Sequence, residues 1–171
     1  LLACVAGALR SYLLEREQSV EGLNVRAVIP VNLRPPDAVI ELGNRFGLIF
    51  LALPVGIADP FDRLMELKRR MDELKNTPEA VVAFGILNAI GMAPTDVESL
   101  IVDIFGSKAT AVMTNVPGPR HQVYFAGAPI TQLMFWVPQS GRLGIGVSIL
   151  SYNDEVLVLS LIHISEPTRP Y

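Results

Sequence analysis

The chain has 171 residues, half of them hydrophobic, and it carries 14 basic and 17 acidic residues for a formal net charge of −3. This length fits one domain, or part of a larger one, with a real core, and the lack of a basic block excludes the electrostatic footprint of nucleic-acid binding. A mean hydropathy of +0.39 is high for a free-standing domain, so we expect apolar surface that faces another domain, a lipid-like ligand or a membrane.

The first 16 residues are predicted to form an amphipathic helix. Apolar side chains recur at helical spacing at Leu2, Val5, Leu9 and Leu13. No capping residue precedes the helix, so we interpret it as cut from a longer chain. The stretch lacks an initiating methionine and a basic leader, which argues against a signal peptide. Cys4, the single cysteine, excludes an internal disulfide and is predicted to be a buried thiol.

Two β-rich runs come next. Residues 25–31 contain Pro30, which has no N–H for a sheet ladder, so we expect a strand on or near a sheet edge. Residues 48–55 are almost continuously apolar, which predicts a strand covered on both faces.

Helices are predicted to follow these strands. Asp59-Pro60 is typical of a helix start, with the carboxylate as N-cap. The expected buried stripe consists of Phe61, Leu64, Leu67, Met71 and Leu74, with Glu66 and Arg70 paired outside. A second helix over residues 77–92 is apolar nearly all round but too short for a membrane span, and a capping box at Thr95 and Glu98 predicts a third helix ending at Gly106.

The last part of the chain is predicted to be a set of strands. Residues 108–114 run into Thr114-Asn115-Val116-Pro117-Gly118-Pro119, where we expect the strand to end in a type II turn with Pro117-Gly118 at its centre. A plain strand-terminating turn explains the same residues. Further strands are predicted over residues 129–137, 142–151 and 155–159, the last two joined by a tight hairpin. This order predicts an α+β fold with a mixed sheet covered by helices.

Residues 159–171 resemble the translation of a transposase-type sequencing adapter. We therefore divide the chain into a domain over residues 1–158 and an artefactual tail, and we give His163 no role.

Several motifs share an order and spacing with one family. They are residues 1–13 (LLACVAGALRSYL), 28–34 (VIPVNLR), 42–45 (LGNR), 115–119 (NVPGP) and 147–152 (VSILSY). On these motifs the chain resembles the carboxy-terminal half of the bacterial wax ester synthase/diacylglycerol acyltransferase family. The resemblance implies a half of a chloramphenicol-acetyltransferase-like fold, in which two similar halves enclose a tunnel for an acyl-CoA and an acyl acceptor.

The resemblance also implies a function. The parent protein would be an O-acyltransferase that moves a fatty acyl group from acyl-CoA, its substrate, to diacylglycerol or a long-chain alcohol, without a further cofactor. In this family a histidine of a His-His-x-x-x-Asp-Gly motif in the other half acts as general base. That motif does not occur here, so we assign no catalytic residue and we expect this chain alone to be inactive. One cysteine and two histidines leave no metal-ligand cluster, so we assign no metal ligand. His121 is interpreted as a surface loop residue.

Polar residues at strand–turn junctions are the candidates for substrate binding or for the domain interface. They are Asn32, Arg34, Asn44, Arg45, Asn115 and Gly118. The same side chains could instead bond their own turns and tie the two halves together. An apolar passage for the acyl chain could be lined by residues 80–92 and by Met134, Phe135 and Trp136, although ordinary core packing also explains these residues.

The expected partners are the missing amino-terminal half and, by resemblance, the surface of a membrane or lipid inclusion in the cytoplasm. A non-catalytic binding or docking module, like those of the condensation domains in biosynthetic assembly lines, is the alternative. A plain α+β domain whose apolar surface reflects a missing partner is the third hypothesis.

Overall fold

A computed structural model of the chain describes residues 1–34, 45–75, 77, 78, 82, 85, 109–138 and 143–162. Its helices and strands, in chain order, are α1 Leu2–Glu15, β1 Val25–Asn32, β2 Phe46–Leu53, α2 Pro60–Lys75, β3 Ala111–Pro117, β4 Tyr124–Phe125, β5 Ala128–Pro129, β6 Ile145–Tyr152 and β7 Glu155–Ile162. The helices predicted over residues 77–92 and 95–106 lie outside the described residues, apart from isolated positions. Neither α1 nor α2 combines the length and hydrophobicity that a bilayer span requires.

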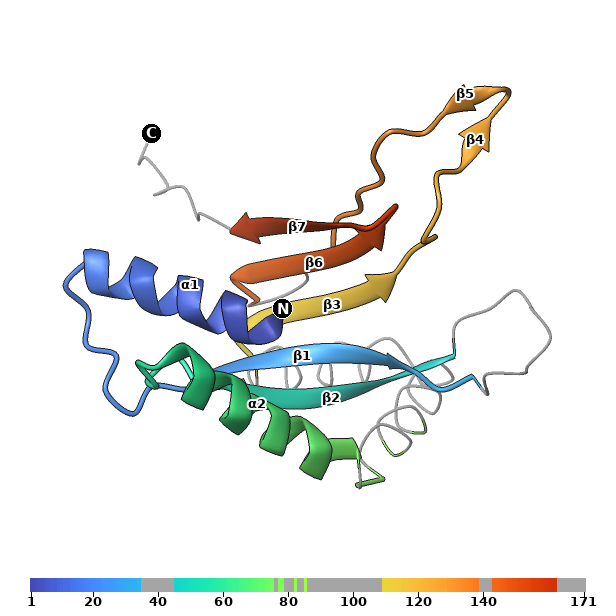
Figure 1. The fold of residues 1–171 in the computed structure, drawn as a ribbon. Coiled ribbons are helices and arrows are strands. Elements are labelled where there is room, and N and C mark those ends of the chain that lie inside the picture. Colours follow the sequence, from blue (N-terminus) through green and yellow to red (C-terminus); the bar gives the residue numbers. More distant parts are fainter. Residues whose placement is uncertain are drawn as a thin grey trace, which may run out of the picture.

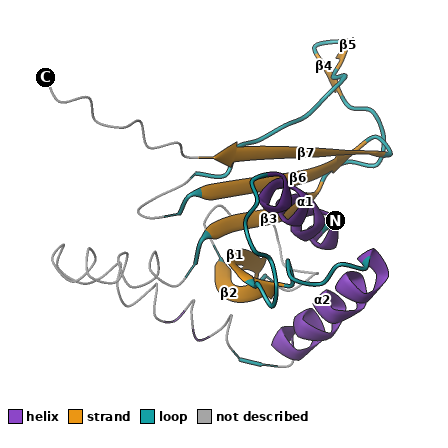
Figure 2. Ribbon diagram, turned by 90° about the vertical axis from the view of Figure 1, so that its left-hand side faces the viewer, coloured by secondary structure: helices purple, strands orange, loops and turns teal. Residues whose placement is uncertain are grey.

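The architecture is a mixed five-stranded sheet with two helices on one face (Figure 1, Figure 2). The strand order is β2-β1-β3-β6-β7. The two outer pairs, β2-β1 and β6-β7, are antiparallel, whereas β1-β3 and β3-β6 are parallel. The predicted α+β class with a mixed sheet is therefore confirmed.

The contact between β1 and β3 is short. Only Ala27–Ala111 and Val28–Val112 are in register there, whereas β1 pairs with β2 over its full length from Val25 to Asn32. Beyond Val28 the two strands diverge (Figure 1). Pro30 lies in this diverging part, where its missing N–H costs no bond to β3. The strand is second from the sheet edge, as predicted.

The main core lies between the sheet and the two helices. Ala3 and Ala6 of α1 are buried against Leu51, Met113 and Ile149 of the sheet, all three fully buried. The predicted apolar stripe of α1 packs against this cluster. The prediction for Cys4 is wrong because the cysteine is exposed: the small residues Ala3 and Ala6 bring the helix close to the sheet and turn Cys4 outward.

Helix α2 begins as predicted. The Asp59 carboxylate accepts hydrogen bonds from the backbone N–H groups of Phe61, at 2.8 Å, and Asp62, at 2.9 Å. The predicted stripe is confirmed for the second half of the helix, where Leu67, Met71 and Leu74 pack on the core. It is wrong for Phe61 and Leu64, whose side chains are 67% and 47% exposed.

The face of α2 that turns to the core contains Arg63 instead. This side chain is buried and donates to the carbonyl oxygens of Ile57, at 2.8 Å, and Ala58, at 3.4 Å. Gly7 of α1 makes room for it, since an added Cβ would lie 2.8 Å from an Arg63 guanidinium nitrogen. Arg10 of α1 donates to Gly56 O at 2.9 Å in the same loop. The two arginines thus hold the loop between β2 and α2 to both helices.

The other face of the sheet carries a smaller cluster. Val28, Ala109, Val112 and Val137 are buried there, with Leu48, Phe50 and Phe135 packed against them. β2 is therefore covered on both faces, as predicted, although less fully on this one. The strand predicted over residues 129–137 is wrong: only Ala128–Pro129 pairs, with β4. Residues 130–137 instead cross the sheet face, where Ser148 Oγ donates to Phe135 O at 2.6 Å. This segment is held by side-chain contacts and not by the backbone hydrogen bonds of a strand pair.

Strands β4 and β5 form the tip of an arm, residues 123–130, that projects from the sheet (Figure 1). Tyr152 holds the base of the arm: its hydroxyl accepts from Val123 N at 3.0 Å and donates to Ile130 O at 2.6 Å. At the tip, Tyr124 and Phe125 are 65% and 77% exposed.

The predicted hairpin between β6 and β7 is confirmed. Asn153 and Asp154 occupy its turn with φ of 49° and 62°, the conformation of a type I′ turn. β7 continues to Ile162 instead of ending near Leu159, so the first residues that resemble an adapter pair with β6.

Ion pairs line the outer face of α2. Glu66 accepts from Arg69 at 2.8 Å and from Arg70 at 2.6 Å, the second being the predicted pair. Arg70 also donates to Ala52 O at 2.7 Å, which ties the helix to β2. The hydrogen bonds from Arg69 and then Arg70 lower the pKa of Glu66 from its ordinary 4.5 to about 2.

We expect these bonds to make folding sensitive to acid. Because the folded-state pKa of Glu66 lies below the unfolded value, its contribution is complete above pH 4.5 and is lost as the pH falls toward about 2. In Glu66→Gln the unfolding midpoint, measured in urea across this window, should fall less steeply than in the wild type. Glu15→Gln is the control, since Glu15 makes no ion pair within the described residues. Parallel curves for Glu66→Gln and the wild type would contradict the assignment.

Candidate functional site

All the predicted site residues that the structure describes lie at one end of the sheet. Strands β1, β3 and β6 run parallel, so their carboxyl ends meet at the same edge (Figure 1), the edge at which open α/β sheets commonly bind ligands. Asn32 ends β1, and Asn115 and Gly118 lie at the end of β3. Asn44 lies outside the described residues.

The group at the end of β1 is held by its own turn. Asn32 Oδ1 accepts from Arg34 N at 3.0 Å, and Leu33 N donates to Arg45 O at 3.1 Å. Asn32 and Arg45 are exposed, and Arg34 is half-buried. For Asn32 the structure shows the turn-bonding role that was the alternative to ligand binding.

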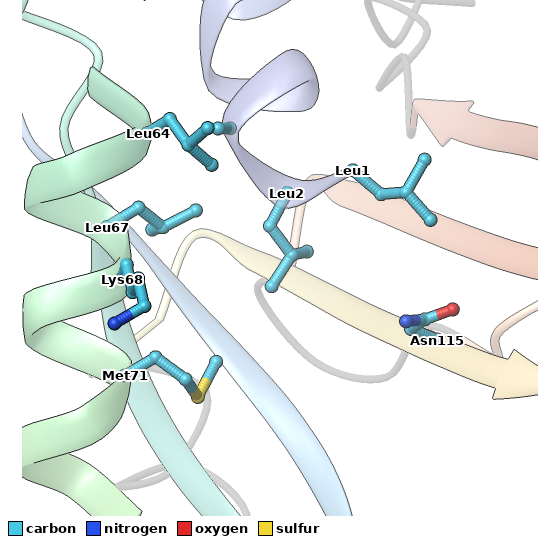
Figure 3. Close-up of a pocket in the computed structure, with 8 residues that line it drawn as sticks. Leu1, Leu2, Leu64, Leu67, Lys68, Met71 and Asn115 are labelled. Carbon is cyan, nitrogen blue, oxygen red and sulfur yellow. The ribbon is translucent and has the colours of Figure 1, made fainter. Parts of the chain in front are cut away.

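Asn115, by contrast, reaches a pocket. The pocket has a volume of about 260 Å³ and lies between the start of α1, helix α2 and the end of β3 (Figure 3). Its lining consists of Leu1, Leu2, Ala3, Leu64, Leu67, Lys68, Met71 and Asn115. We call it the α1–α2 pocket.

The wall of this pocket is mostly aliphatic, with two polar side chains. Lys68 Nζ donates to Asp72 Oδ2 at 3.1 Å, and Lys68 and then Lys75 lower the pKa of Asp72 by hydrogen bonding. The lysine head is thus engaged on the outer face of α2, and only its stem contributes to the lining. Asn115 makes no side-chain hydrogen bond to any residue that the structure describes.

Strand alternation places Asn115 in this pocket. Ala111 and Met113 face the helices and are fully buried, and Asn115 is the next residue on the same face of β3. The sequence shows this alternation. The α2 residues of the lining were missed as site residues, because their helical spacing indicates only a core stripe and does not reveal that α2 and the end of β3 border the same pocket.

Gly118 belongs to a second hollow, also of about 260 Å³, at the β6–β7 hairpin, with Arg120, Ser151 and Asp154 among its lining residues. The predicted end of the strand and the type II turn are wrong here. β3 continues through Pro117, which is in register with Ser151, and Gly118 has no positive φ. Glycine is required because an added Cβ would lie 2.3 Å from Ser151 O, while Gly118 N donates to that oxygen at 2.9 Å.

Among the described residues no group of histidine, cysteine and acidic side chains could hold a metal ion. His121 is exposed, as predicted, and lies in the loop that leads into the arm. Met134 and Trp136 are 45% and 59% exposed, whereas Phe135 packs on the sheet. Most of residues 80–92, the other predicted wall of the acyl passage, lie outside the described residues, so the passage stays a prediction.

The comparisons with known proteins define the class. A family model described as the WS/DGAT C-terminal domain matches residues 42–163. The chain therefore belongs to the wax ester synthase/diacylglycerol acyltransferase family, as its carboxy-terminal domain.

Particular relatives agree with this membership. The chain is 25% identical over 159 residues to the probable diacylglycerol O-acyltransferase tgs1 of Mycobacterium tuberculosis, covering 91% of this chain and 34% of that protein. It is 30% identical over 132 residues to the probable diacylglycerol O-acyltransferase tgs2 of the same organism, covering 75% of this chain and 29% of that protein. The chain thus spans about a third of the length of these relatives.

A solved structure confirms the predicted half of a chloramphenicol-acetyltransferase-like fold. The wax ester synthase/diacylglycerol acyltransferase from Marinobacter aquaeolei VT8 superposes with a TM-score of 0.60 at 24% identity, covering 94% of this chain and 36% of that one. The names of the relatives describe acyltransferases and do not favour the non-catalytic binding module.

The contact at Gly118 allows a test of the site's backbone. Gly118→Ala should destabilise the protein by about 1–3 kcal/mol, because the new methyl group forces the ends of β3 and β6 apart. Urea unfolding would measure this loss. Gly144→Ala is the matched control, since no atom lies within 4 Å of its added Cβ, and its change should stay within about 0.5 kcal/mol. Equal losses in the two variants would show that the close approach to Ser151 is unimportant.

Proposed function

We propose that the parent protein transfers a fatty acyl group from acyl-CoA to diacylglycerol or a long-chain alcohol, and that this chain forms the carboxy-terminal half of its substrate tunnel. Membership of the WS/DGAT family is the observation that carries the proposal. The names of the Mycobacterium tuberculosis relatives, which specify diacylglycerol O-acyltransferases, support diacylglycerol as the acyl acceptor.

The chemistry divides between the two halves. By resemblance, a histidine of the His-His-x-x-x-Asp-Gly motif in the amino-terminal half takes the proton from the acceptor hydroxyl. The hydroxyl oxygen attacks the thioester carbonyl, the C–S bond breaks, and coenzyme A leaves as the thiol after receiving the proton. The described part of this chain contributes apolar walls that exclude water, so that the acceptor alcohol rather than water reaches the thioester. We expect the chain alone to form no ester.

The arm gives the amino-terminal half a place to dock. Two-stranded hairpins are marginally stable alone, yet this one carries Tyr124 and Phe125 at its tip, both largely exposed. Packing against the other half would remove these aromatic side chains from water, which is favourable by about 25 cal/mol per Å² of apolar surface. We therefore take the amino-terminal half as the arm's partner.

The decisive experiment joins this chain to the amino-terminal part of tgs1, which supplies the histidine motif. The joined protein should form ester from long-chain acyl-CoA with diacylglycerol or a long-chain alcohol, measured by thin-layer chromatography of radiolabelled product. Replacing the motif histidine by alanine should lower the rate about 10²–10⁴-fold. A folded joined protein that forms no ester with any of these acceptors would contradict the proposal.

By the same resemblance we propose that the parent protein is cytoplasmic and binds peripherally to a membrane or lipid inclusion. Exposed apolar side chains outside the arm, such as Val156 and Val158 of β7, support surface binding. The joined protein should float with phosphatidylcholine vesicles in a density gradient, and sedimentation apart from the vesicles would count against this location.

A further inference from the structure

One polar group stands out in the α1–α2 pocket. Asn115 is the only lining residue that combines a hydrogen-bonding side chain with the lack of a side-chain partner among the described residues, because the Lys68 head is engaged by Asp72. Figure 3 shows Asn115 at one side of the pocket, Leu64, Leu67 and Met71 of α2 pointing into it from the opposite side, and Leu2 between them. The pocket therefore has an apolar length and one polar end.

The backbone at Asn115 is paired with a neighbouring strand on one side only, and the Asn115 side chain is exposed. β3 is in register with β6 from Ala111 to Pro117, so the backbone at Asn115 is held from that side. On the other side β1 has diverged, since its last register with β3 is Val28–Val112. Asn115 thus occupies the core face of the sheet at the point where the close packing of Met113 under the helices ends.

These features specify the chemistry of a ligand. An aliphatic wall selects a hydrocarbon chain, and a carboxamide can donate to a carbonyl or hydroxyl oxygen and accept from a hydroxyl. A volume of about 260 Å³ lies just below the range of pockets that enclose a drug-sized molecule. The pocket is therefore suited to the segment of a chain next to its oxygen-bearing end, not to a whole long chain.

We propose that the α1–α2 pocket binds the oxygen-proximal segment of a long-chain alcohol, with the Asn115 carboxamide hydrogen-bonded to the alcohol oxygen and Leu64, Leu67 and Met71 against the first carbons. The biological role of this alcohol as the acyl acceptor rests on the proposed function. Asn115 is a substrate-binding residue in this view and takes no proton.

Photolabelling of the full 171-residue chain tests the proposal. The probe is a medium-chain primary alcohol with a diazirine near its hydroxyl end, and the matched probe is the same chain without the hydroxyl. Mass spectrometry of digested protein should find saturable labelling by the alcohol on α2, between Leu64 and Met71. In Asn115→Leu the half-saturating concentration of the alcohol should rise about fivefold, as expected for one lost hydrogen bond, while labelling by the alkane stays unchanged.

Two further variants make the outcome decisive. Leu64→Trp, at a half-exposed position of the lining, should fill the pocket and remove labelling by both probes. Thr114→Val changes the neighbouring residue on the opposite face of β3 and should label like the wild type. The proposal is overturned if the label falls on the arm or elsewhere instead of α2, if wild type is not labelled, or if Asn115→Leu changes the two probes equally or not at all.

This measurement is independent of catalysis. If α2 is labelled and Asn115→Leu responds as expected, but the joined protein forms no ester, the proposed function is contradicted and the binding site is retained. If the joined protein forms ester but Asn115→Leu does not respond as expected, only the binding site is contradicted.

Discussion

The whole arrangement depends on the short parallel contact between β1 and β3. Two register positions, Ala27–Ala111 and Val28–Val112, join the β2-β1 pair to the β3-β6-β7 set. A contact this small supplies few backbone hydrogen bonds, so the two parts of the sheet must be held together mainly by side chains. The helices do this, because the core that contains Ala3, Ala6 and Leu67 also contains Leu51 of β2 and Ile149 of β6.

The same constraint produces the candidate site. If β1 and β3 stayed paired to their ends, Asn115 would follow Met113 into a continuous sheet face. Their divergence leaves the last part of β3 with a partner on the β6 side only. The pocket forms between the start of α1, the middle of α2 and this end of β3 (Figure 3). Its apolar lining comes from the start of α1 and from Leu64, Leu67 and Met71 of α2.

Two arginines of the helices, the buried Arg63 and the half-buried Arg10, have a structural role in this arrangement. Arg63 fills the space above Gly7, and together with Arg10 it bonds carbonyl oxygens of the loop from Val55 to Ala58. Arg63 Nη1 donates to two of these carbonyl oxygens, while the buried Arg63 Nε has no hydrogen-bond partner among the described residues. These two side chains therefore link α1 and α2 to the same loop.

Local sequence patterns determined much of the secondary structure of this protein. The repeat of Leu2, Val5, Leu9 and Leu13 specifies the buried side of α1, and Asp59 before Pro60 specifies where α2 begins, because both effects act within a few residues of the chain. The Asn153-Asp154 turn is local in the same sense. The family motifs, including the residues around Asn115, were also visible in the sequence alone.

What only the tertiary structure decided involves contacts between distant segments. Cys4 is exposed because Ala3 and Ala6 approach the sheet, Phe61 is exposed because Arg63 takes the inner face of α2, and residues 130–137 cross the sheet face instead of joining it. Gly118 needs its missing side chain because Ser151, far along the chain, lies against it. Asn115 becomes a candidate binding residue, and Asn32 a turn residue, through neighbours that no spacing within one segment can specify.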